Sequence, residues 1–296
     1  MKRLSLIIVS LLMLTLTATP AAARKYGETL RILAIGNSFS DDGMEHLPAI
    51  LADLGVENVE LARLYVGGCT LERHYNFYNN EEAAYIFYHS EAGENRWVKA
   101  EEKVSMQYAL AMGEWDIITL QQASGVSGIY DSYVPYLEQL INIVSKAQPQ
   151  AELVWHMTWS YSTDSNHGEF PNYDRDQLKM YDAITACVHR LKKDYKAIDK
   201  IIPSGTTIQS LRQSAINNSP KDLTRDGYHM DFGAGRYALA CTWYESIVKP
   251  YTKRSMMGNG VRLDLGEIKV TDHTAPYCQK AAKRAVKHPF KVEAVK

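Results

Sequence analysis

Short apolar runs alternate with longer stretches of helical periodicity along most of this chain. The apolar runs predict strands at residues 31–35, 59–64, 116–120, 152–156 and 200–202. Apolar side chains recur every three or four positions, as one face of a helix requires, at residues 47–54, 134–144, 175–193 and 233–248. This alternation is typical of an α/β domain, so we predict a three-layer α/β/α sandwich with a mostly parallel sheet of about five strands.

Three segments depart from this pattern. Residues 85–101 hold two aromatic-containing runs around a turn-like Ala-Gly-Glu-Asn, which predicts a β-hairpin inserted before the third strand. Residues 160–172 are polar and predict a long loop after the fourth strand. Beyond residue 254 the chain is basic and weakly patterned, with one helical stretch near 279–286. We therefore expect one domain over residues 24–254 and a C-terminal tail over 255–296.

The first 23 residues have the pattern of a secretory signal peptide. Lys2 and Arg3 precede an apolar run over residues 4–16, and three alanines at 21–23 provide a cleavage site. The sequence thus predicts an exported protein, periplasmic or secreted, with no stable membrane insertion after cleavage. An uncleaved anchor is the alternative, although the apolar run is short for a membrane span.

Composition excludes several classes of partner and site. The formal net charge is −1 and no long basic stripe is present, which argues against nucleic acid as a partner. No glycine-rich phosphate motif occurs, and the histidines lack the paired spacing of a catalytic zinc site, so we expect neither metal nor organic cofactor. The cysteines are widely scattered, which favours buried thiols, although export would permit a disulfide: Cys69, Cys187, Cys241 and Cys278.

A candidate nucleophile follows the first predicted strand. Gly36-Asn37-Ser38 lies where that strand turns into a helix, so Ser38 is expected at the carboxyl edge of the sheet. Open α/β sheets bind ligands at that edge, and a helix start offers free N–H groups to developing negative charge. The alternative is that Ser38 merely caps the helix.

A candidate acid–base pair precedes the last predicted helix. Asp226 and His229 are three residues apart, so the carboxylate can hold the imidazole in one tautomer while the other ring nitrogen faces a hydroxyl. The chain order Ser, Asp, His is an accepted order for a catalytic triad. Alternatively, this is a solvated turn in which Asp226 or Asp231 caps the helix.

Together these motifs resemble the SGNH hydrolases, the GDSL esterase superfamily, over roughly residues 30–248. Gly36-Asn37-Ser38 corresponds to the family's first block, and Asp226-Gly227-Tyr228-His229 to its D-x-x-H block. Gly68 corresponds to the family's second block. The resemblance implies that Ser38, Asp226 and His229 form a triad, and that the backbone N–H groups of Ser38 and Gly68 bind the oxyanion.

The sequence departs from that family pattern at two places. Asn37 replaces the usual Asp, which is not a triad member. The third block, normally an Asn, reads Gln-Gln-Ala-Ser at residues 121–124, which is similar to a less characterised bacterial branch. The amide of Gln121 or Gln122 is then the candidate third oxyanion donor; alternatively, both side chains bind loop backbone.

These observations predict an exported serine esterase that removes short acyl groups, such as acetyl, from a glycan. His156 and Trp159, at the end of the fourth strand, are weak candidates for substrate contact, the alternative being burial in the core. Rival functions are a non-catalytic glycan-binding protein with a decayed oxyanion site, and a lipase or thioesterase on the same fold. An α/β-hydrolase is disfavoured because Ser38 lacks the G-x-S-x-G motif. The sequence predicts no oligomeric state.

Overall fold

A seven-stranded sheet forms the centre of the computed structural model, which describes residues 28–296. The predicted signal peptide therefore lies outside the described residues. The strands, in chain order, are β1 (Leu30–Gly36), β2 (Val59–Tyr65), β3 (Tyr85–Ser90), β4 (Val98–Val104), β5 (Ile117–Leu120), β6 (Glu152–His156) and β7 (Ile198–Ile202). Their spatial order is β4-β3-β2-β1-β5-β6-β7. Strands β2, β1, β5, β6 and β7 are parallel to one another. Strand β3 pairs antiparallel with β2, and β4 pairs antiparallel with β3.

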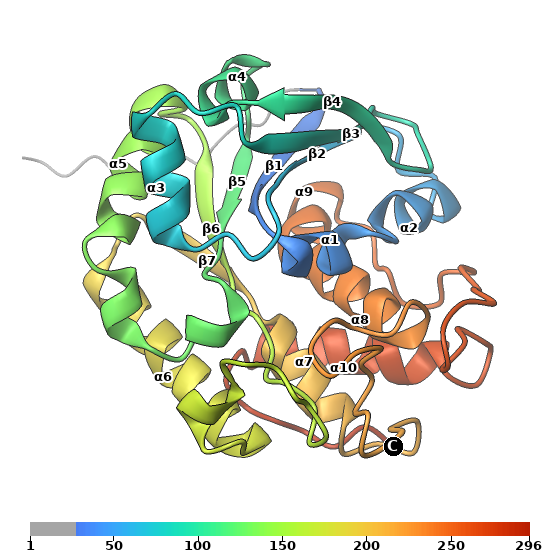
Figure 1. Cartoon of the computed structure of the whole chain (residues 1–296). Helices are drawn as coiled ribbons and strands as arrows, with labels where there is room; N and C mark the ends of the chain where they lie inside the picture. Colours follow the sequence, from blue (N-terminus) through green and yellow to red (C-terminus); the bar gives the residue numbers. More distant parts are fainter. Residues whose placement is uncertain (1–27) are drawn as a thin grey trace, which may run out of the picture.

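Helices cover both faces of this sheet. They are α1 (Ser38–Met44), α2 (Leu47–Asp53), α3 (Leu71–Asn79), α4 (Met106–Ala111), α5 (Tyr136–Ala147), α6 (Gln177–Asp194), α7 (Ser204–Leu211), α8 (Ala234–Trp243), α9 (Lys249–Thr252) and α10 (Ala275–Lys287). Helices α3, α5 and α6 lie on one side of the sheet, and α1, α2 and α8 on the other (Figure 1). Because both faces are covered, β1 and β5 are apolar almost throughout and buried. The predicted three-layer α/β/α architecture is confirmed.

The sheet is larger than expected because the predicted hairpin joins it. Strand β3 pairs antiparallel with β2, and β4 pairs with β3 at the outer edge. Tyr85 and Phe87 of β3 are buried, which anchors the hairpin, whereas six of the seven residues of β4 are exposed. The inserted segment thus adds two strands to the five predicted ones.

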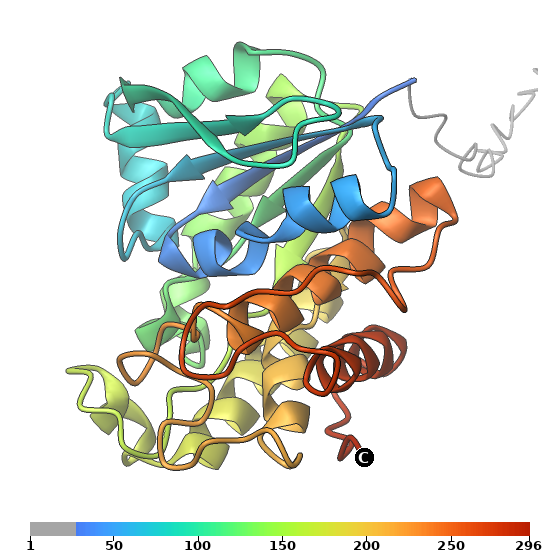
Figure 2. The same ribbon diagram turned by 90° about the vertical axis from the view of Figure 1, so that its right-hand side faces the viewer.

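The C-terminal segment is part of the domain, contrary to the tail that the sequence predicted. Helix α10 packs against α7 and α8 on the outside of the molecule (Figure 2). Its inner face consists of small buried side chains, which let the helices approach closely: Ala275, Cys278, Ala281, Ala282 and Ala285. Small residues among lysines and arginines give a weak apolar signal, which explains why the pattern beyond residue 254 was misleading.

All four cysteines are free and buried in the described part of the chain, as the first of the two alternatives predicted. No helix within residues 28–296 is long and apolar enough to cross a membrane.

Candidate active site

Ser38 lies at the point where the order of the parallel strands reverses. Strand β1 has β2 on one side and β5 on the other, so the chain leaves the end of β1 into a crevice of the kind that binds ligands in open α/β sheets. Asn37 caps helix α1, because its side-chain oxygen accepts a hydrogen bond of 3.0 Å from the N–H of Phe39. Ser38 is therefore the first residue of α1, and the capping role falls to Asn37 rather than to Ser38.

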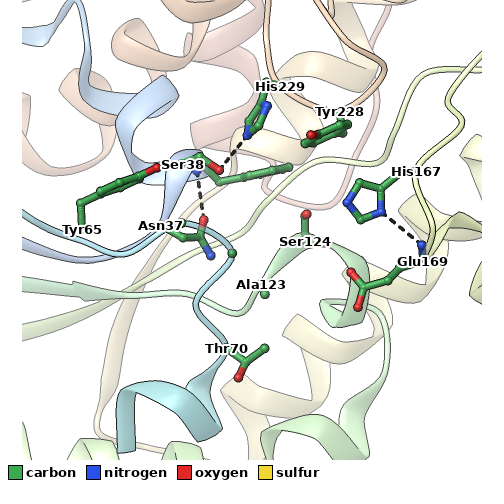
Figure 3. A pocket seen from close by; sticks show the side chains of 13 residues that line it. Asn37, Ser38, Tyr65, Thr70, Ala123, Ser124, His167, Glu169, Tyr228 and His229 are labelled. Atoms are coloured by element: carbon green, nitrogen blue, oxygen red, sulfur yellow. Dashed lines mark hydrogen bonds between the residues drawn. The ribbon is translucent and has the colours of Figure 1, made fainter. Parts of the chain in front are cut away.

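The three predicted triad residues lie in one continuous hydrogen-bonded chain (Figure 3). His229 Nε2 lies 2.7 Å from Ser38 Oγ, and His229 Nδ1 lies 2.7 Å from Asp226 Oδ2. The Asp226 carboxylate accepts a hydrogen bond from Nδ1–H, which leaves Nε2 free to accept the Ser38 hydroxyl proton. This is the arrangement that activates a serine for nucleophilic attack.

The Asp226 carboxylate is held by the turn that carries it. Its Oδ1 accepts hydrogen bonds from the N–H groups of Tyr228, at 3.2 Å, and His229, at 2.8 Å. Partial burial by itself raises the pKa of Asp226, but the hydrogen bonds from the His229 ring and from these N–H groups lower it below its ordinary value. Asp226 therefore stays ionised, as the orienting role requires.

A buried ion cluster fastens this turn to the nucleophile helix. Asp42 of α1 is fully buried and pairs with Arg225, at 3.0 Å, and with Arg236, at 2.8 Å. Its Oδ2 also accepts a hydrogen bond of 2.8 Å from the N–H of Met230, the residue after His229. The acid–base turn and the helix that begins with Ser38 are thereby joined by one carboxylate.

Two backbone donors face the pocket beside Ser38. The N–H groups of Ser38 and Gly68 have no hydrogen-bond partner among residues 28–296, and both residues line the same pocket. Gly68 has a φ of +57°, a conformation that favours glycine, in the short loop between β2 and α3. Free N–H groups so placed are suited to receive an oxyanion.

The other predicted site residues lie behind the pocket rather than in it. Gln121 and Gln122 are buried: Gln121 donates to Asn37 Oδ1 at 2.7 Å, and Gln122 donates to Ser132 and accepts from the N–H of Leu71. The geometry therefore does not support direct oxyanion binding by either amide. The side chains are engaged within the protein, as in the alternative that we considered from the sequence.

His156 and Trp159 are likewise core residues, which corrects their expected contact with substrate. Both are completely buried, and neither lines the pocket. Trp159 stacks on Phe39 with ring centroids 4.2 Å apart and donates its indole N–H to the carbonyl of Tyr228. His156 bonds Gln121 and Ser204, and burial lowers its pKa to about 3, so the ring is neutral.

Part of the pocket lining comes from residues that the sequence did not single out. Tyr65 lies at the end of β2, and Tyr228 lies in the turn between Asp226 and His229. His167 and Glu169 belong to the polar loop after β6 (Figure 3). The His167 ring lies against that of Tyr228, with centroids 4.7 Å apart. The polarity of the loop was visible in the sequence, but no spacing marked these two side chains.

One carboxylate of the nucleophile helix is poorly solvated. Asp41 Oδ1 is buried without a hydrogen bond in the described part of the chain, and Arg63 Nη1 lies 3.6 Å away. Burial raises the pKa of Asp41 to about 6, opposed by the charge of Arg63 and assisted by those of Glu45 and Asp42.

This raised pKa predicts a pH-dependent stability. Protonation of Asp41 favours the folded state, so its stabilising effect is full below about pH 4 and is lost as the pH rises through about 6. We expect Asp41→Asn to raise the free energy of unfolding by about 2 kcal/mol at pH 7.5 and to change it little at pH 4. Guanidinium unfolding at the two pH values measures this, with the exposed Asp272→Asn as control. An equal effect at both pH values would contradict the assignment.

Comparison with known proteins identifies the family of this chain. A family model described as a domain of unknown function, DUF4886, matches residues 31–273. The chain belongs to the DUF4886 family. A crystal structure of a DUF4886 family protein from Bacteroides uniformis ATCC 8492 is 36% identical, with a TM-score of 0.81, and the match covers 90% of this chain and 98% of that one.

More distant solved structures also resemble this DUF4886 protein. A proposed GDSL-like lipase from Parabacteroides merdae ATCC 43184 is 12% identical, with a TM-score of 0.50, over 76% of this chain and 98% of that one. A proposed SGNH hydrolase from Slackia heliotrinireducens is 22% identical, with a TM-score of 0.49, over 74% and 99%. No curated protein matches the chain. The likeness to the GDSL-like lipase concerns the fold alone.

Proposed function

We propose that this DUF4886 protein is a serine esterase of the SGNH type, with Ser38 as nucleophile, His229 as base and Asp226 as the group that orients the base. The observation that carries the proposal is the hydrogen-bonded chain from Ser38 through His229 to Asp226. It opens into a pocket that also contains the free N–H groups of Ser38 and Gly68. Nucleophile, base and oxyanion donors are the parts that acyl transfer requires.

The acylation step follows from this geometry. His229 Nε2 takes the hydroxyl proton as Ser38 Oγ forms a bond to the ester carbonyl carbon, and the carbonyl π electrons move to oxygen. The oxyanion accepts hydrogen bonds from the N–H groups of Ser38 and Gly68. Its collapse breaks the bond to the alcohol oxygen, which receives the proton from His229 and leaves as the free alcohol.

Deacylation repeats these transfers with water. His229 takes a proton from water while the water oxygen attacks the acyl carbon. The second oxyanion accepts hydrogen bonds from the same two N–H groups. When it collapses, the bond to Ser38 Oγ breaks and His229 returns the proton to that oxygen. The products are a carboxylic acid and the original enzyme, and no step requires a metal or an organic cofactor.

Active-site labelling tests this function directly. The mature protein is treated with a fluorophosphonate, and the labelled residue is identified by mass spectrometry of peptides, alongside Ser38→Ala. We expect one label, on Ser38, and none on the variant. The rival glycan-binding protein predicts that no serine is labelled and that glycan binds without ester turnover. A series of p-nitrophenyl esters then separates a short-chain esterase from a lipase, because the latter prefers long acyl chains.

The pocket favours a polyol as the alcohol part of the ester. His167 Nδ1 accepts a hydrogen bond of 3.2 Å from the N–H of Glu169, so a neutral His167 presents its Nε2–H to a ligand. The exposed Glu169 carboxylate offers acceptors, and Tyr65 and Tyr228 offer aromatic surface and hydroxyls. Sugars bind to such combinations of donors, acceptors and rings, which supports a short acyl group on a glycan as substrate.

The charge of Glu169 predicts selectivity against anionic sugars. Because Glu169 is exposed, repulsion between its carboxylate and a second one about 4 Å away is screened as in water and costs about 1 kcal/mol, or about fivefold in kcat/KM. We expect acetylated methyl glucoside to be preferred over acetylated methyl glucuronate by about this factor, and Glu169→Gln to remove the preference. Glu91→Gln, in the exposed β3–β4 turn, is the matched control. A preference that persists in Glu169→Gln would exclude this role.

Export is also proposed, on the pattern of residues 1–23. Cell fractionation followed by N-terminal sequencing tests it, because cleavage is expected to give a mature protein that begins near Arg24. A protein that retains its first residues and stays in the cytoplasm would contradict the proposal.

A further inference from the structure

A chain of four buried polar side chains runs behind the nucleophile. Gln121 Nε2 lies 2.7 Å from Asn37 Oδ1, and Gln121 Oε1 lies 2.8 Å from His156 Nδ1. His156 Nε2 continues the chain to Ser204 Oγ, at 2.9 Å. All four residues are at most 2% exposed, so water does not compete for these bonds. A buried polar network that is satisfied at each link fixes its members in one arrangement.

One backbone group determines the direction of every hydrogen bond in this network. The N–H of Phe39 can only donate, so the Asn37 atom that it meets must be the oxygen Oδ1. The Gln121 atom that meets the same oxygen must then be the nitrogen Nε2. The Gln121 oxygen therefore faces His156, whose Nδ1 must carry the proton of the neutral ring. His156 Nε2 then accepts a hydrogen bond from the Ser204 hydroxyl.

This direction turns the amide nitrogen of Asn37 toward the oxyanion region. Asn37 Nδ2 donates one N–H to the carbonyl of Cys69, at 3.1 Å, next to Gly68. An amide nitrogen carries two hydrogens, and the second has no partner among residues 28–296. Asn37 lines the same pocket as Ser38 and Gly68, and its amide nitrogen points toward the loop after β2 that carries Gly68 (Figure 3).

We propose that the side-chain amide of Asn37 is the third oxyanion donor of this site, with Gln121 and His156 as positioning residues behind it. This inference rests on the proposed esterase function. It assigns to the residue before the nucleophile the role that SGNH enzymes give to an amide of the third block. Gln121 does not take that role directly, because it lies behind Asn37 and does not line the pocket.

Gly36 provides the space that this arrangement needs. A Cβ on Gly36 would lie 2.5 Å from Ser40 Oγ and 3.0 Å from Gln121 Oε1, so any side chain there would clash with Ser40 and crowd the Gln121 amide. During attack on an ester, the carbonyl oxygen gains an electron pair and accepts a hydrogen bond from the free N–H of Asn37. Because Phe39 and Gln121 already fix the amide, no reorganisation is required at that moment.

The decisive variant is Asn37→Asp. Aspartate keeps an acceptor for Phe39 and Gln121 but has no N–H to donate. Loss of one oxyanion donor typically lowers kcat by about 100-fold to 1000-fold, so we expect a fall of about 100-fold in p-nitrophenyl acetate hydrolysis with KM within about threefold of wild type. Asn95→Asp, an exposed site in the β3–β4 turn, is the matched control and should retain full activity.

A second variant covers the case in which Asn37→Asp does not fold. Gln121→Leu keeps Asn37 but removes one of the three hydrogen bonds that orient its amide, so kcat is expected to fall about tenfold with unchanged KM. Thermal unfolding is measured for each variant, because a purely structural role would lower Tm without this split between kcat and KM.

The outcomes separate this inference from the proposed function. A wild-type protein that hydrolyses no ester and is not labelled on Ser38 overturns the esterase proposal itself. An active wild type together with a folded Asn37→Asp whose kcat stays within threefold overturns the Asn37 assignment alone. A rise in KM at unchanged kcat overturns it as well, because that result marks a substrate contact rather than a transition-state donor.

Discussion

His229→Ala is expected to lower kcat for p-nitrophenyl acetate by a factor of about 10⁴ to 10⁶, with little change in KM. Removal of the base leaves Ser38 as an ordinary alcohol, and triad members act as a unit, so loss of one residue removes most of the effect of all three. His229 Nε2 is 2.7 Å from Ser38 Oγ, so no rearrangement is needed for proton transfer. Steady-state kinetics on purified protein measures the effect.

Two further variants test the same assignment. Asp226→Asn should cost about 10⁴ in kcat, because an amide can hold the imidazole in the wrong tautomer. His273→Ala, at an exposed histidine remote in sequence from the triad, should retain wild-type rates. If His229→Ala kept more than a tenth of wild-type activity, the residues assigned to the triad would be wrong even if the protein is an esterase.

Asp42→Ala is expected to lower the free energy of unfolding by about 3 to 5 kcal/mol, the usual cost of removing one partner from a buried ion pair. The substitution leaves Arg225 and Arg236 without their shared carboxylate and the N–H of Met230 without its acceptor. Denaturant unfolding at pH 7 measures the change. The turn that carries His229 should also lose its fixed position, so activity is expected to fall more steeply with temperature than in wild type.

An exposed ion pair provides the matched control for Asp42. Asp272 pairs with Arg262 at 2.8 Å but is 95% exposed, and such pairs contribute little. Asp272→Ala should therefore change stability by less than about 1 kcal/mol. A loss at Asp42 no larger than this would show that the buried cluster does not hold the two halves of the site together.

Local sequence pattern was sufficient for the central layers of the fold. Strands β1, β2, β5, β6 and β7 all overlap the short apolar runs, because parallel strands that are covered on both faces are largely apolar. The same reasoning could not place the hairpin strands in the sheet. Strand β4 is an edge strand whose charged side chains are exposed, so nothing in its composition indicates which strand it pairs with.

The residues of the proposed triad could be predicted because they belong to two short motifs at element boundaries. The proposed third oxyanion donor could not, because Gln121, His156 and Trp159 all follow or end strands at the correct edge, and sequence does not tell whether such a side chain faces the crevice or the next helix. Here Ser204 and Tyr228 supply hydrogen bonds that draw two of these side chains inward. His167 and Glu169 reached the pocket through a loop whose path depends on tertiary contacts with Tyr228.

The distance along the chain between the reacting groups has a consequence for folding. Ser38 and His229 are 191 residues apart, and the Asp42 contact to Met230 spans 188. Closing contacts of such separation is slow, and it requires the intervening strands to be assembled first. A chain that has formed only its N-terminal half therefore holds a serine but no base. The proposed hydrolytic activity therefore reports the completely folded molecule, and its recovery after denaturation follows the last steps of folding rather than the first.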